Sequence, residues 1–504
     1  MSIAQVLSRA KIGLAAPQVH VEVHLAAGLP SFTLVGLPAP VVRESRERVR
    51  AAIVNSGFEF PAGRITVNLA PVELAKEGGR FDLPIAIGVL LAANQIRNVL
   101  PCPVECYGEL GLSGELKPVG GLLPAALQAV RAGHRLVLPR ANLIDVALAG
   151  TQDTVGCRSL REVCEALAGG LTASAPLRKC AGTGSLRKQS LCFEGIKGQW
   201  SAKRALVVAA AGGHSILLYG PPGSGKSLLA SRLIDLLPPV TEEEGVQMAC
   251  IASVANDAFD AQSWGERPYR APHHSASATA IIGGGARLHP GEISLAHGGV
   301  LFLDELPEFD RRVLEALREP LESGVITLSR VAGTLHLPAG FQLVAAMNPC
   351  PCGHHGDPVE TCRCTVREIQ RYRARISGPL LDRIDLRVAV PRQPLQELMP
   401  GATADAGFGD PDQLVAWIAD ARMRQVRRAG CANARLAARR LSADCALDAG
   451  AAELLEGGRE KLSLSGRGLH RLLRIARTIA DLAGDESIGR PHLAEAIQLR
   501  RDMN

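Results

Sequence analysis

The sequence predicts an α/β protein in three parts, the last of which is helical. Stretches with the two-residue alternation of strands take turns with stretches of helical periodicity through the first part. In the second part an apolar strand, a glycine-rich loop and an apolar helix follow one another directly. The 504 residues are enough for several domains of ordinary size.

The first part, residues 1–170, is predicted to form one compact α/β domain. We expect an alternating strand in "VHVEVHL" from Val19, followed by a helix in "VVRESRERVRAAIVNSG" that ends at Gly57. A second strand and a second helix are expected in "RITVNLAP" and "DLPIAIGVLLAANQ". Residues 171–190 lose this periodicity and are rich in Ser, Thr, Gly, Lys and Arg, which indicates a linker.

The second part, residues 191–394, contains the stretch "SILLYGPPGSGKSLLASRLIDLL". This strand, loop and helix predict a phosphate-binding loop for ATP, because its glycines let successive backbone N–H groups converge on phosphates at a helix N-terminus. Lys226 would reach the β- and γ-phosphates, and Ser227 would be a ligand of Mg²⁺. A glycine-rich turn that binds nothing is the alternative. The predicted nucleotide-binding residues are Gly220, Pro221, Pro222, Gly223, Ser224, Gly225, Lys226 and Ser227.

Two adjacent carboxylates end the apolar strand in "GGVLFLDELPEF". Asp304 would hold the Mg²⁺ shell, and Glu305 would polarise the water that attacks the γ-phosphate. A solvated strand end would explain this segment by itself, but not its occurrence together with the phosphate-binding loop.

Three further polar residues follow in an informative order. Asn348 ends the apolar strand in "FQLVAAMNPC", Arg383 lies in "ISGPLLDRIDLRVAV", and Arg467 begins the amphipathic helix in "LSLSGRGLHRLLRIARTIADL". This order resembles that of the AAA+ ATPases. The resemblance implies that Asn348 is sensor 1, Arg383 the arginine finger and Arg467 sensor 2, in a nucleotide-dependent homohexameric ring.

Two longer stretches narrow the resemblance. "YRAPHHSASATAIIGGGARLHPGEISLAHGGVLFLDE" is similar to the signature of the magnesium-chelatase branch of AAA+ proteins, with its helix-2 insert, and "ESGVITLSRVAGTLHLPAGFQLVAAMNP" is similar to its presensor-1 hairpin. The whole chain resembles the ComM/YifB family, which implies a bacterial hexameric motor for DNA branch migration in natural transformation. Arg287 and Arg330 lie on the two inserts and are the expected DNA contacts, whereas His273 and His274 are DNA contacts or structural hydrogen-bonding residues.

The first part has a resemblance of its own. "LAKEGGRFDLP" and "GELGLSGELKPVGGLLPAALQAVRAGHRLVLPRAN" are similar to the proteolytic domain of Lon, which implies a ribosomal-S5-domain-2-like fold. Arg80 stands where Lon carries its nucleophilic serine, and Leu123 stands where Lon carries its activating lysine. Because a serine–lysine mechanism needs both the hydroxyl and the amine, we expect a scaffold without peptidase activity.

The third part, residues 395–504, is predicted to be a helical lid. Its segment 421–440, "ARMRQVRRAGCANARLAARR", holds seven arginines and no acidic residue. Two interpretations remain open: a solvated helical face, and contacts with a phosphate backbone.

Four cysteines are concentrated in "NPCPCGHHGDPVETCRC". Cys350, Cys352, Cys362 and Cys364 can close a tetrahedral site for structural Zn²⁺ in a segment that has almost no apolar residues of its own. His354 or His355 is an alternative ligand, and four reduced thiols without metal are the competing interpretation.

The remaining features limit the function classes. There is no signal-peptide pattern and no apolar run long enough to span a bilayer, so we expect a cytoplasmic protein without a membrane partner. A net charge of +6 neither requires nor excludes nucleic acid. We expect an ATP-driven motor acting on single-stranded or branched DNA. The alternatives are a protein-remodelling motor of the magnesium-chelatase type, which lacks the Lon-like domain, and a Lon-type peptidase, which Arg80 and Leu123 disfavour.

Overall fold

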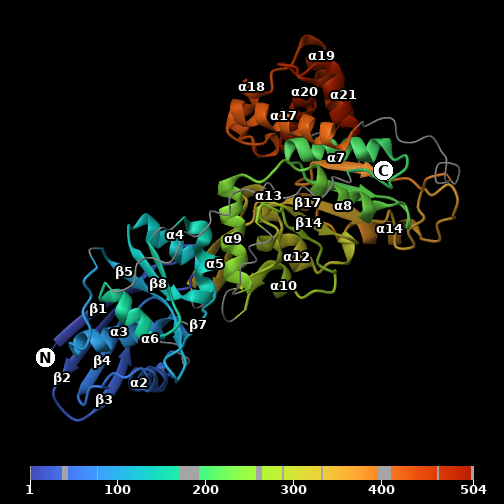
Figure 1. Cartoon of the computed structure of the whole chain (residues 1–504). Helices are drawn as coiled ribbons and strands as arrows, with labels where there is room; N and C mark the ends of the chain where they lie inside the picture. Colours follow the sequence, from blue (N-terminus) through green and yellow to red (C-terminus); the bar gives the residue numbers. More distant parts are fainter. Residues whose placement is uncertain are drawn as a thin grey trace.

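The three predicted parts follow one another along an elongated chain in the computed structural model (Figure 1). The structure describes residues 2–36, 42, 44–76, 78–100, 102–150, 153–169, 192–256, 264–285, 289–330, 333–394, 410–462 and 465–500. The predicted linker 171–190 lies outside these residues. No helix in the described ranges is long and apolar enough to cross a membrane.

The first part is built on a mixed sheet of seven strands. Its order is β3 (Ser31–Val35), β4 (Arg64–Ala70), β2 (Gln18–Ala26), β1 (Ser2–Arg9), β5 (Val104–Cys106), β8 (Arg135–Pro139) and β9 (Thr154–Cys157). The expected alternation is seen in β2, where Val19, Val21 and Val23 are fully buried and the residues between them are not.

Helices cover this sheet, and two short strands extend from it. The helices are α2 (Ser45–Asn55), α3 (Asp82–Ala92), α4 (Leu123–Arg131), α5 (Leu143–Val146) and α6 (Leu160–Leu167), and the short strands are β6 (Glu109–Leu110) and β7 (Leu116–Lys117). Ten of the eleven residues of α3 are buried, which explains its nearly continuous apolar sequence.

The second part contains a sheet of five parallel strands. Its order is β11 (Tyr269–Arg270), β14 (Val300–Leu303), β17 (Gln342–Met347), β10 (Ile216–Tyr219) and β18 (Leu386–Ala389). Its helices include α7 (Trp200–Gly212), α8 (Lys226–Leu236), α9 (Glu242–Asn256), α12 (Arg311–Ala316), α13 (Arg318–Ser323), α14 (Val366–Arg373) and α15 (Gly378–Leu381). The three central strands are almost wholly buried, as expected of parallel strands that helices cover on both faces.

Both predicted inserts are present in this part. The first contains α10 (Ala278–Ile282), the short pair β12 (Gly283–Gly284) and β13 (His289–Pro290), and α11 (Glu292–Leu295). The second is an antiparallel hairpin of β15 (Val325–Arg330) and β16 (Gly333–Pro338), in which Arg330 pairs with Gly333. Arg330 therefore lies at the hairpin turn, as expected.

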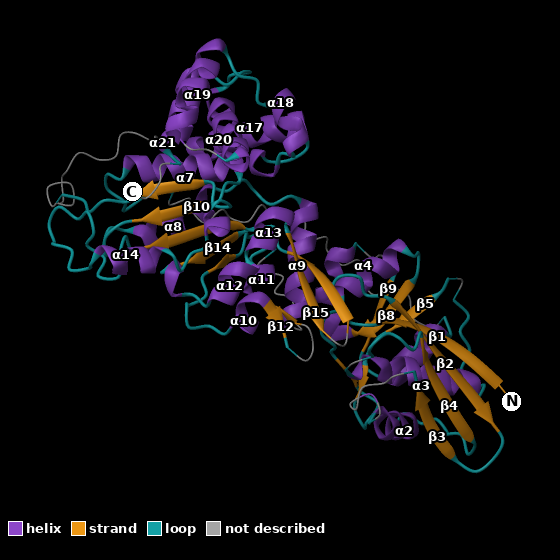
Figure 2. Ribbon diagram, turned by 180° about the vertical axis from the view of Figure 1, so that it is seen from behind, coloured by secondary structure: helices purple, strands orange, loops and turns teal. Residues whose placement is uncertain are grey.

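The first part is attached to the second through a shared apolar cluster. Helix α4 lies beside α9 (Figure 2), and Leu123 and Ala126 of α4 are buried in one cluster with Ala249 and Cys250 of α9. Leu123 thus contributes to packing at the position where Lon carries its lysine.

The third part is a helical lid that packs on α7. It consists of α17 (Pro411–Ala429), α18 (Leu441–Asp444), α19 (Ala449–Leu462), α20 (Gly466–Ala483) and α21 (Arg490–Gln498). One apolar cluster joins these helices to α7, α8 and the central strands, so the lid and the second part share a core.

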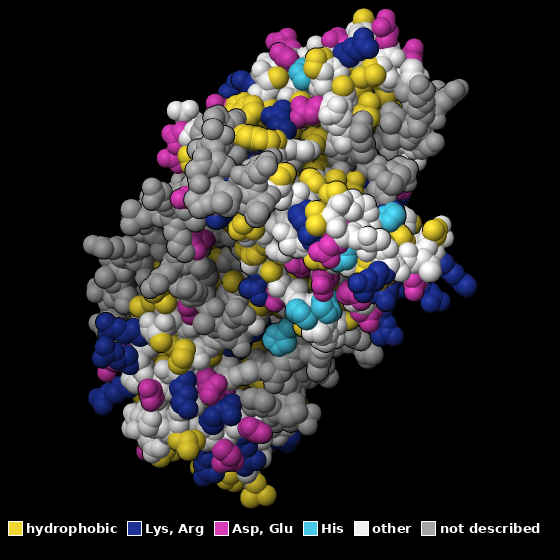
Figure 3. All heavy atoms as spheres, turned by 90° about the vertical axis from the view of Figure 1, so that its right-hand side faces the viewer, with side chains coloured by type: hydrophobic (Ala, Val, Ile, Leu, Met, Phe, Trp, Pro, Cys, Tyr) yellow, Lys and Arg dark blue, Asp and Glu magenta, His cyan; other side chains and the backbone are white. Residues whose placement is uncertain are grey.

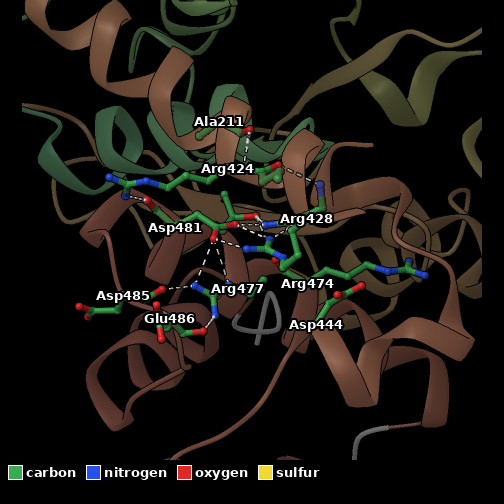
Figure 4. A network of polar contacts seen from close by, with 12 residues as sticks. Ala211, Arg424, Arg428, Asp444, Arg474, Arg477, Asp481, Asp485 and Glu486 are labelled. Atoms are coloured by element: carbon green, nitrogen blue, oxygen red, sulfur yellow. Dashed lines mark hydrogen bonds and ion pairs between the residues drawn. The ribbon is translucent and has the colours of Figure 1, made fainter. Parts of the chain in front are cut away.

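Several arginines of the segment 421–440 make internal hydrogen bonds. Arg422 donates to Ala211 O at 2.8 Å, and Arg424 donates to Asp481 O at 2.7 Å. Arg428 binds the Asp481 carboxylate at 2.7 and 2.8 Å, and Arg477 shares the same carboxylate at 3.2 Å (Figure 4). Neither of the two interpretations predicted these internal bonds. Arg427, Arg435 and Arg439 are exposed, and for them both interpretations stay open.

The shared carboxylate gives a prediction about stability. Asp481 is 2% exposed, so Asp481→Ala would leave Arg428 and Arg477 without their counter-charge, and we expect the free energy of unfolding to fall by about 3 kcal/mol. Urea denaturation followed by tryptophan fluorescence, to which Trp417 of α17 contributes, measures this change. Asp420→Ala, at an exposed position of α17, is the control. An equal loss in both variants would contradict the role given to Asp481.

Candidate nucleotide site

The predicted phosphate-binding loop joins β10 to α8 and lines a pocket of about 390 Å³. Gly220 is required by space, because a Cβ there would lie 2.1 Å from Val390 O. Gly225 has a φ of 89°, which places it in the left-handed region just before Lys226 begins the helix. Gly220 and Pro221 do not line the pocket itself. Its lining residues are Pro222, Gly223, Ser224, Gly225, Lys226, Ser227, Leu228, Asp304, Glu305, Met347 and Asn348.

The pocket brings Lys226 and Asn348 together. The Nζ atom of Lys226 donates to Gly220 O and Pro221 O at 2.8 Å and to Asn348 Oδ1 at 3.2 Å. Burial lowers the pKa of Lys226, and the carboxylates of Asp304 and Glu305 oppose this shift. The ammonium is thus held at the mouth of the loop, where a phosphate would replace carbonyl partners.

The oxygen atoms expected at Mg²⁺ also meet. Ser227 Oγ donates to Asp304 Oδ2 at 2.7 Å, and Asp304 Oδ1 accepts from the backbone N–H of Glu305 at 2.9 Å. Hydroxyl and carboxylate oxygens beside a phosphate-binding loop are the ligands that Mg²⁺ prefers. The residues present therefore fit ATP with Mg²⁺.

Glu305 has a partner that the sequence analysis did not assign. Its Oε2 atom lies 3.3 Å from Nδ1 of His274, while the neighbouring His273 binds Ser275 Oγ at 2.8 Å. His274 follows β11, which pairs with β14, and Glu305 follows β14. The sequence showed the paired histidines but not which strand β11 adjoins, so their place at the pocket was not predictable.

The two predicted arginines do not line this pocket. Arg383 donates to the carboxylate of Glu322 and to Pro379 O at 2.9 Å, and Arg467 is the second residue of α20. No arginine is among the described residues that line the pocket. Arg383 and Arg467 therefore contribute nothing to the nucleotide pocket of their own subunit in this conformation.

The four cysteines form a compact group directly after Asn348. The Sγ atom of Cys350 lies 3.4 Å from that of Cys352 and 3.7 Å from that of Cys362, and one possible ligand atom from each of the four residues lies within 4.8 Å of the others. Four thiolates about 2.3 Å from a Zn²⁺ would be roughly 3.8 Å apart, so the group fits a tetrahedral site. His354 instead lies 3.3 Å from a Glu360 carboxylate oxygen.

The cysteine loop also contacts the phosphate-binding loop. A Cβ on Gly353 would lie 2.6 Å from Cγ of Pro222, so the two loops are in direct contact. Backbone N–H groups of His354 and Arg363 lower the pKa of Cys352, whereas the pKa values of Cys362 and Cys364 are raised by burial and neighbouring thiols although backbone N–H groups oppose this.

Only one of the two residues expected to contact DNA is among the described residues. Arg330 lies at the turn of the β15–β16 hairpin, and Arg287 lies outside the described residues. On the face shown in Figure 3, basic and acidic side chains of the described residues are interspersed. The described residues of that face therefore form no continuous basic patch that would indicate a nucleic-acid surface.

The residues at the Lon-like dyad positions have other partners. Arg80 Nη2 donates to Gly120 O at 2.5 Å, and Leu123 is fully buried. These two positions supply neither a hydroxyl nucleophile nor an amine base.

Comparisons with known proteins agree with this geometry. The family model "Magnesium chelatase, subunit ChlI" matches residues 192–398, "Subunit ChlI of Mg-chelatase" matches 21–142, and "Magnesium chelatase, subunit ChlI C-terminal" matches 412–500. The competence protein ComM of Haemophilus influenzae is 47% identical over 99% of this chain and 98% of its own. YifB of Salmonella typhimurium is 46% identical over 99% and 97%, and a Lon protease of Chloroflexus aurantiacus is 31% identical over 25% of this chain and 16% of its own.

The pocket predicts two separable defects. Lys226→Ala should weaken ATP binding about tenfold or more, because it removes a charged partner of the phosphates. Glu305→Gln should bind ATP normally but hydrolyse it about 100-fold more slowly, because the amide cannot accept the proton of the water. Equilibrium binding of a fluorescent ATP analogue and steady-state phosphate release measure the two effects. Near-normal turnover in Glu305→Gln would remove this residue from catalysis.

Proposed function

The chain belongs to the ComM/YifB family of magnesium-chelatase-like AAA+ proteins, and on that basis we propose that it is a cytoplasmic, ATP-driven DNA motor. It acts as an ATP-dependent homohexamer on single-stranded or branched DNA. The reaction is branch migration during the recombination of incoming DNA in natural transformation. The name of the competence protein ComM supports this assignment.

The observation that favours a DNA motor is the attachment of the β15–β16 hairpin. The hairpin lies in the chain between β14, which leads to Asp304 and Glu305, and β17, which leads to Asn348. Its base is closed by Ala339 N donating to Gly324 O at 2.8 Å. A change at the nucleotide pocket therefore reaches the hairpin through α12 and α13 on one side and through β17 on the other, and a DNA strand bound at the hairpin turn would move with it.

The residues of the pocket divide the chemistry among them. Bound ATP with Mg²⁺ supplies the γ-phosphoryl group and the charge that neutralises its oxygens. Lys226 and the backbone amides of the loop bind the phosphates, and Ser227 and Asp304 hold the metal. Glu305 accepts a proton from the attacking water, and Asn348 orients that water together with Lys226.

Arg383 and Arg467 act across a subunit interface in this proposal. Neither lines the pocket of its own chain, and a guanidinium that stays charged is suited to phosphate oxygens of a neighbour. Hydrolysis then requires the ring. The residues at the dyad positions, Arg80 and Leu123, argue against a peptidase.

The test is the response of ATP hydrolysis to DNA. Single-stranded and forked DNA should each raise the rate of phosphate release severalfold, and forked substrates should be resolved only with ATP. Arg330→Ala should reduce this response, whereas Arg312→Ala, at an exposed position of α12, should not. Hydrolysis that ignores every DNA substrate would instead favour a protein-remodelling motor of the magnesium-chelatase type.

We also propose that the four-cysteine group holds a structural Zn²⁺. Elemental analysis of chelator-washed protein should give about one zinc per chain. Replacing Cys362 and Cys364 by serine should remove the zinc, lower the melting temperature and weaken ATP binding, because the cysteine loop contacts Pro222. Cys431→Ser, at a partly exposed lid cysteine, is the control. Active protein without zinc or another transition metal would refute this proposal.

A further inference from the structure

The side chain of Arg383 is folded back onto its own chain. Its guanidinium is bound by the Glu322 carboxylate and Pro379 O, and the side chain is only 10% exposed. Its Nε atom is buried and has no hydrogen-bond partner among the described residues. A buried donor without a partner is unfavourable, so the guanidinium is not fully hydrogen-bonded in this conformation. The bond to Glu322 is what holds the side chain there.

The backbone of Arg383 is fixed more firmly than its side chain. Its carbonyl oxygen accepts from Arg471 Nη1 at 2.7 Å and from Ser215 Oγ at 3.1 Å. Ser215 immediately precedes β10, and Arg471 lies on α20. The attachment point of the side chain is therefore constant, and only the guanidinium is free to change partners.

Glu322 belongs to the base of the β15–β16 hairpin. It lies on α13, which ends at Ser323, and one glycine separates Ser323 from β15. The hydroxyl of Ser323 binds Glu319 O at 2.9 Å and Val325 O at 3.0 Å, so the end of the helix and the start of the strand are joined. A displacement of the hairpin therefore displaces Glu322.

The charged groups that shift the pKa of Glu322 are all positive. The hydrogen bond from Arg383 lowers the pKa of Glu322, and the charges of Arg383, Arg467 and Arg471 add to this effect. The side chain of Glu322 is 57% exposed, and exposure to water favours the same ionised form. The carboxylate of Glu322 binds Arg383 directly, and Arg467 acts on it through charge alone.

We propose that Glu322 is a latch on Arg383, through which the hairpin controls hydrolysis in the neighbouring subunit. This inference rests on the proposed function. Without DNA, Glu322 occupies the guanidinium and competes with phosphate oxygens, which bind the same donors. When DNA moves the hairpin, Glu322 withdraws and Arg383 turns to the nucleotide of the neighbour.

The test is the rate of ATP hydrolysis by the hexamer of Glu322→Gln with and without single-stranded DNA. The neutral amide releases Arg383, so the rate without DNA should rise about fivefold, which is the factor equivalent to ~1 kcal/mol for an ion pair of this exposure. The ratio of the rates with and without DNA should then approach one. The double variant Glu322→Gln/Arg383→Ala should lose the increase. Melting temperatures verify that the variants are folded.

Glu319→Gln is the matched control. Glu319 is an exposed glutamate of the same helix that accepts from Thr327 Oγ1 of β15 at 2.8 Å. An equal rise in Glu319→Gln would overturn the latch, because a looser hairpin would then be sufficient. A DNA-free rate in Glu322→Gln at or below that of the wild type would overturn it as well. A wild-type protein that hydrolyses ATP but ignores DNA would overturn the proposed function itself, on which the latch rests.

Discussion

The parallel pairing of β10 with β17 is the constraint on which the nucleotide site depends. Tyr219 pairs with Met347, and the next residues, Gly220 and Asn348, leave the sheet at the same level. The ladder continues by one bond, from Gly220 N to Met347 O at 3.3 Å. Because parallel strands end at one edge of a sheet, this register places the phosphate-binding loop, Asn348 and the cysteine loop side by side. A shift of the register by one residue would move Asn348 and the cysteine loop about 3.3 Å along the sheet relative to the phosphate-binding loop.

The sequence identified those site residues whose position follows from their own strand. Three groups of residues were predictable because each follows an apolar strand: the loop 220–227, the pair Asp304 and Glu305, and Asn348. The four cysteines were predictable from their spacing. His274 and Glu322 were not, because each acquires its role from a segment that is distant in sequence. The mixed pairing of the first sheet and the internal bonds of the arginine-rich segment were unpredictable for the same reason. Local patterns specify elements, whereas contacts between elements require the tertiary structure.

The first part packs against the second part in two places. Leu123 is buried in the cluster that joins α4 to α9. A second contact lies at the hairpin, because a Cβ on Gly13 would be 2.3 Å from Cδ1 of Leu335 on β16. The domain therefore touches both a helix of the ATPase core and the strand that follows the hairpin turn.

The lid is bound to its own core by a buried polar chain. His214, which directly precedes Ser215 and β10, lies 3.3 Å from Asp385 Oδ2 and 2.8 Å from Thr478 Oγ1 of α20. Although burial would raise the pKa of Asp385, the hydrogen bond and charge of His214 and the charge of Arg471 hold it below its usual range. Breaking a buried and charged network of this kind is costly, so α20 and the central sheet move as one body. In the proposed homohexamer, relative movement is then left to the interface between subunits and to the hairpin, which the contact between Glu322 and Arg383 connects.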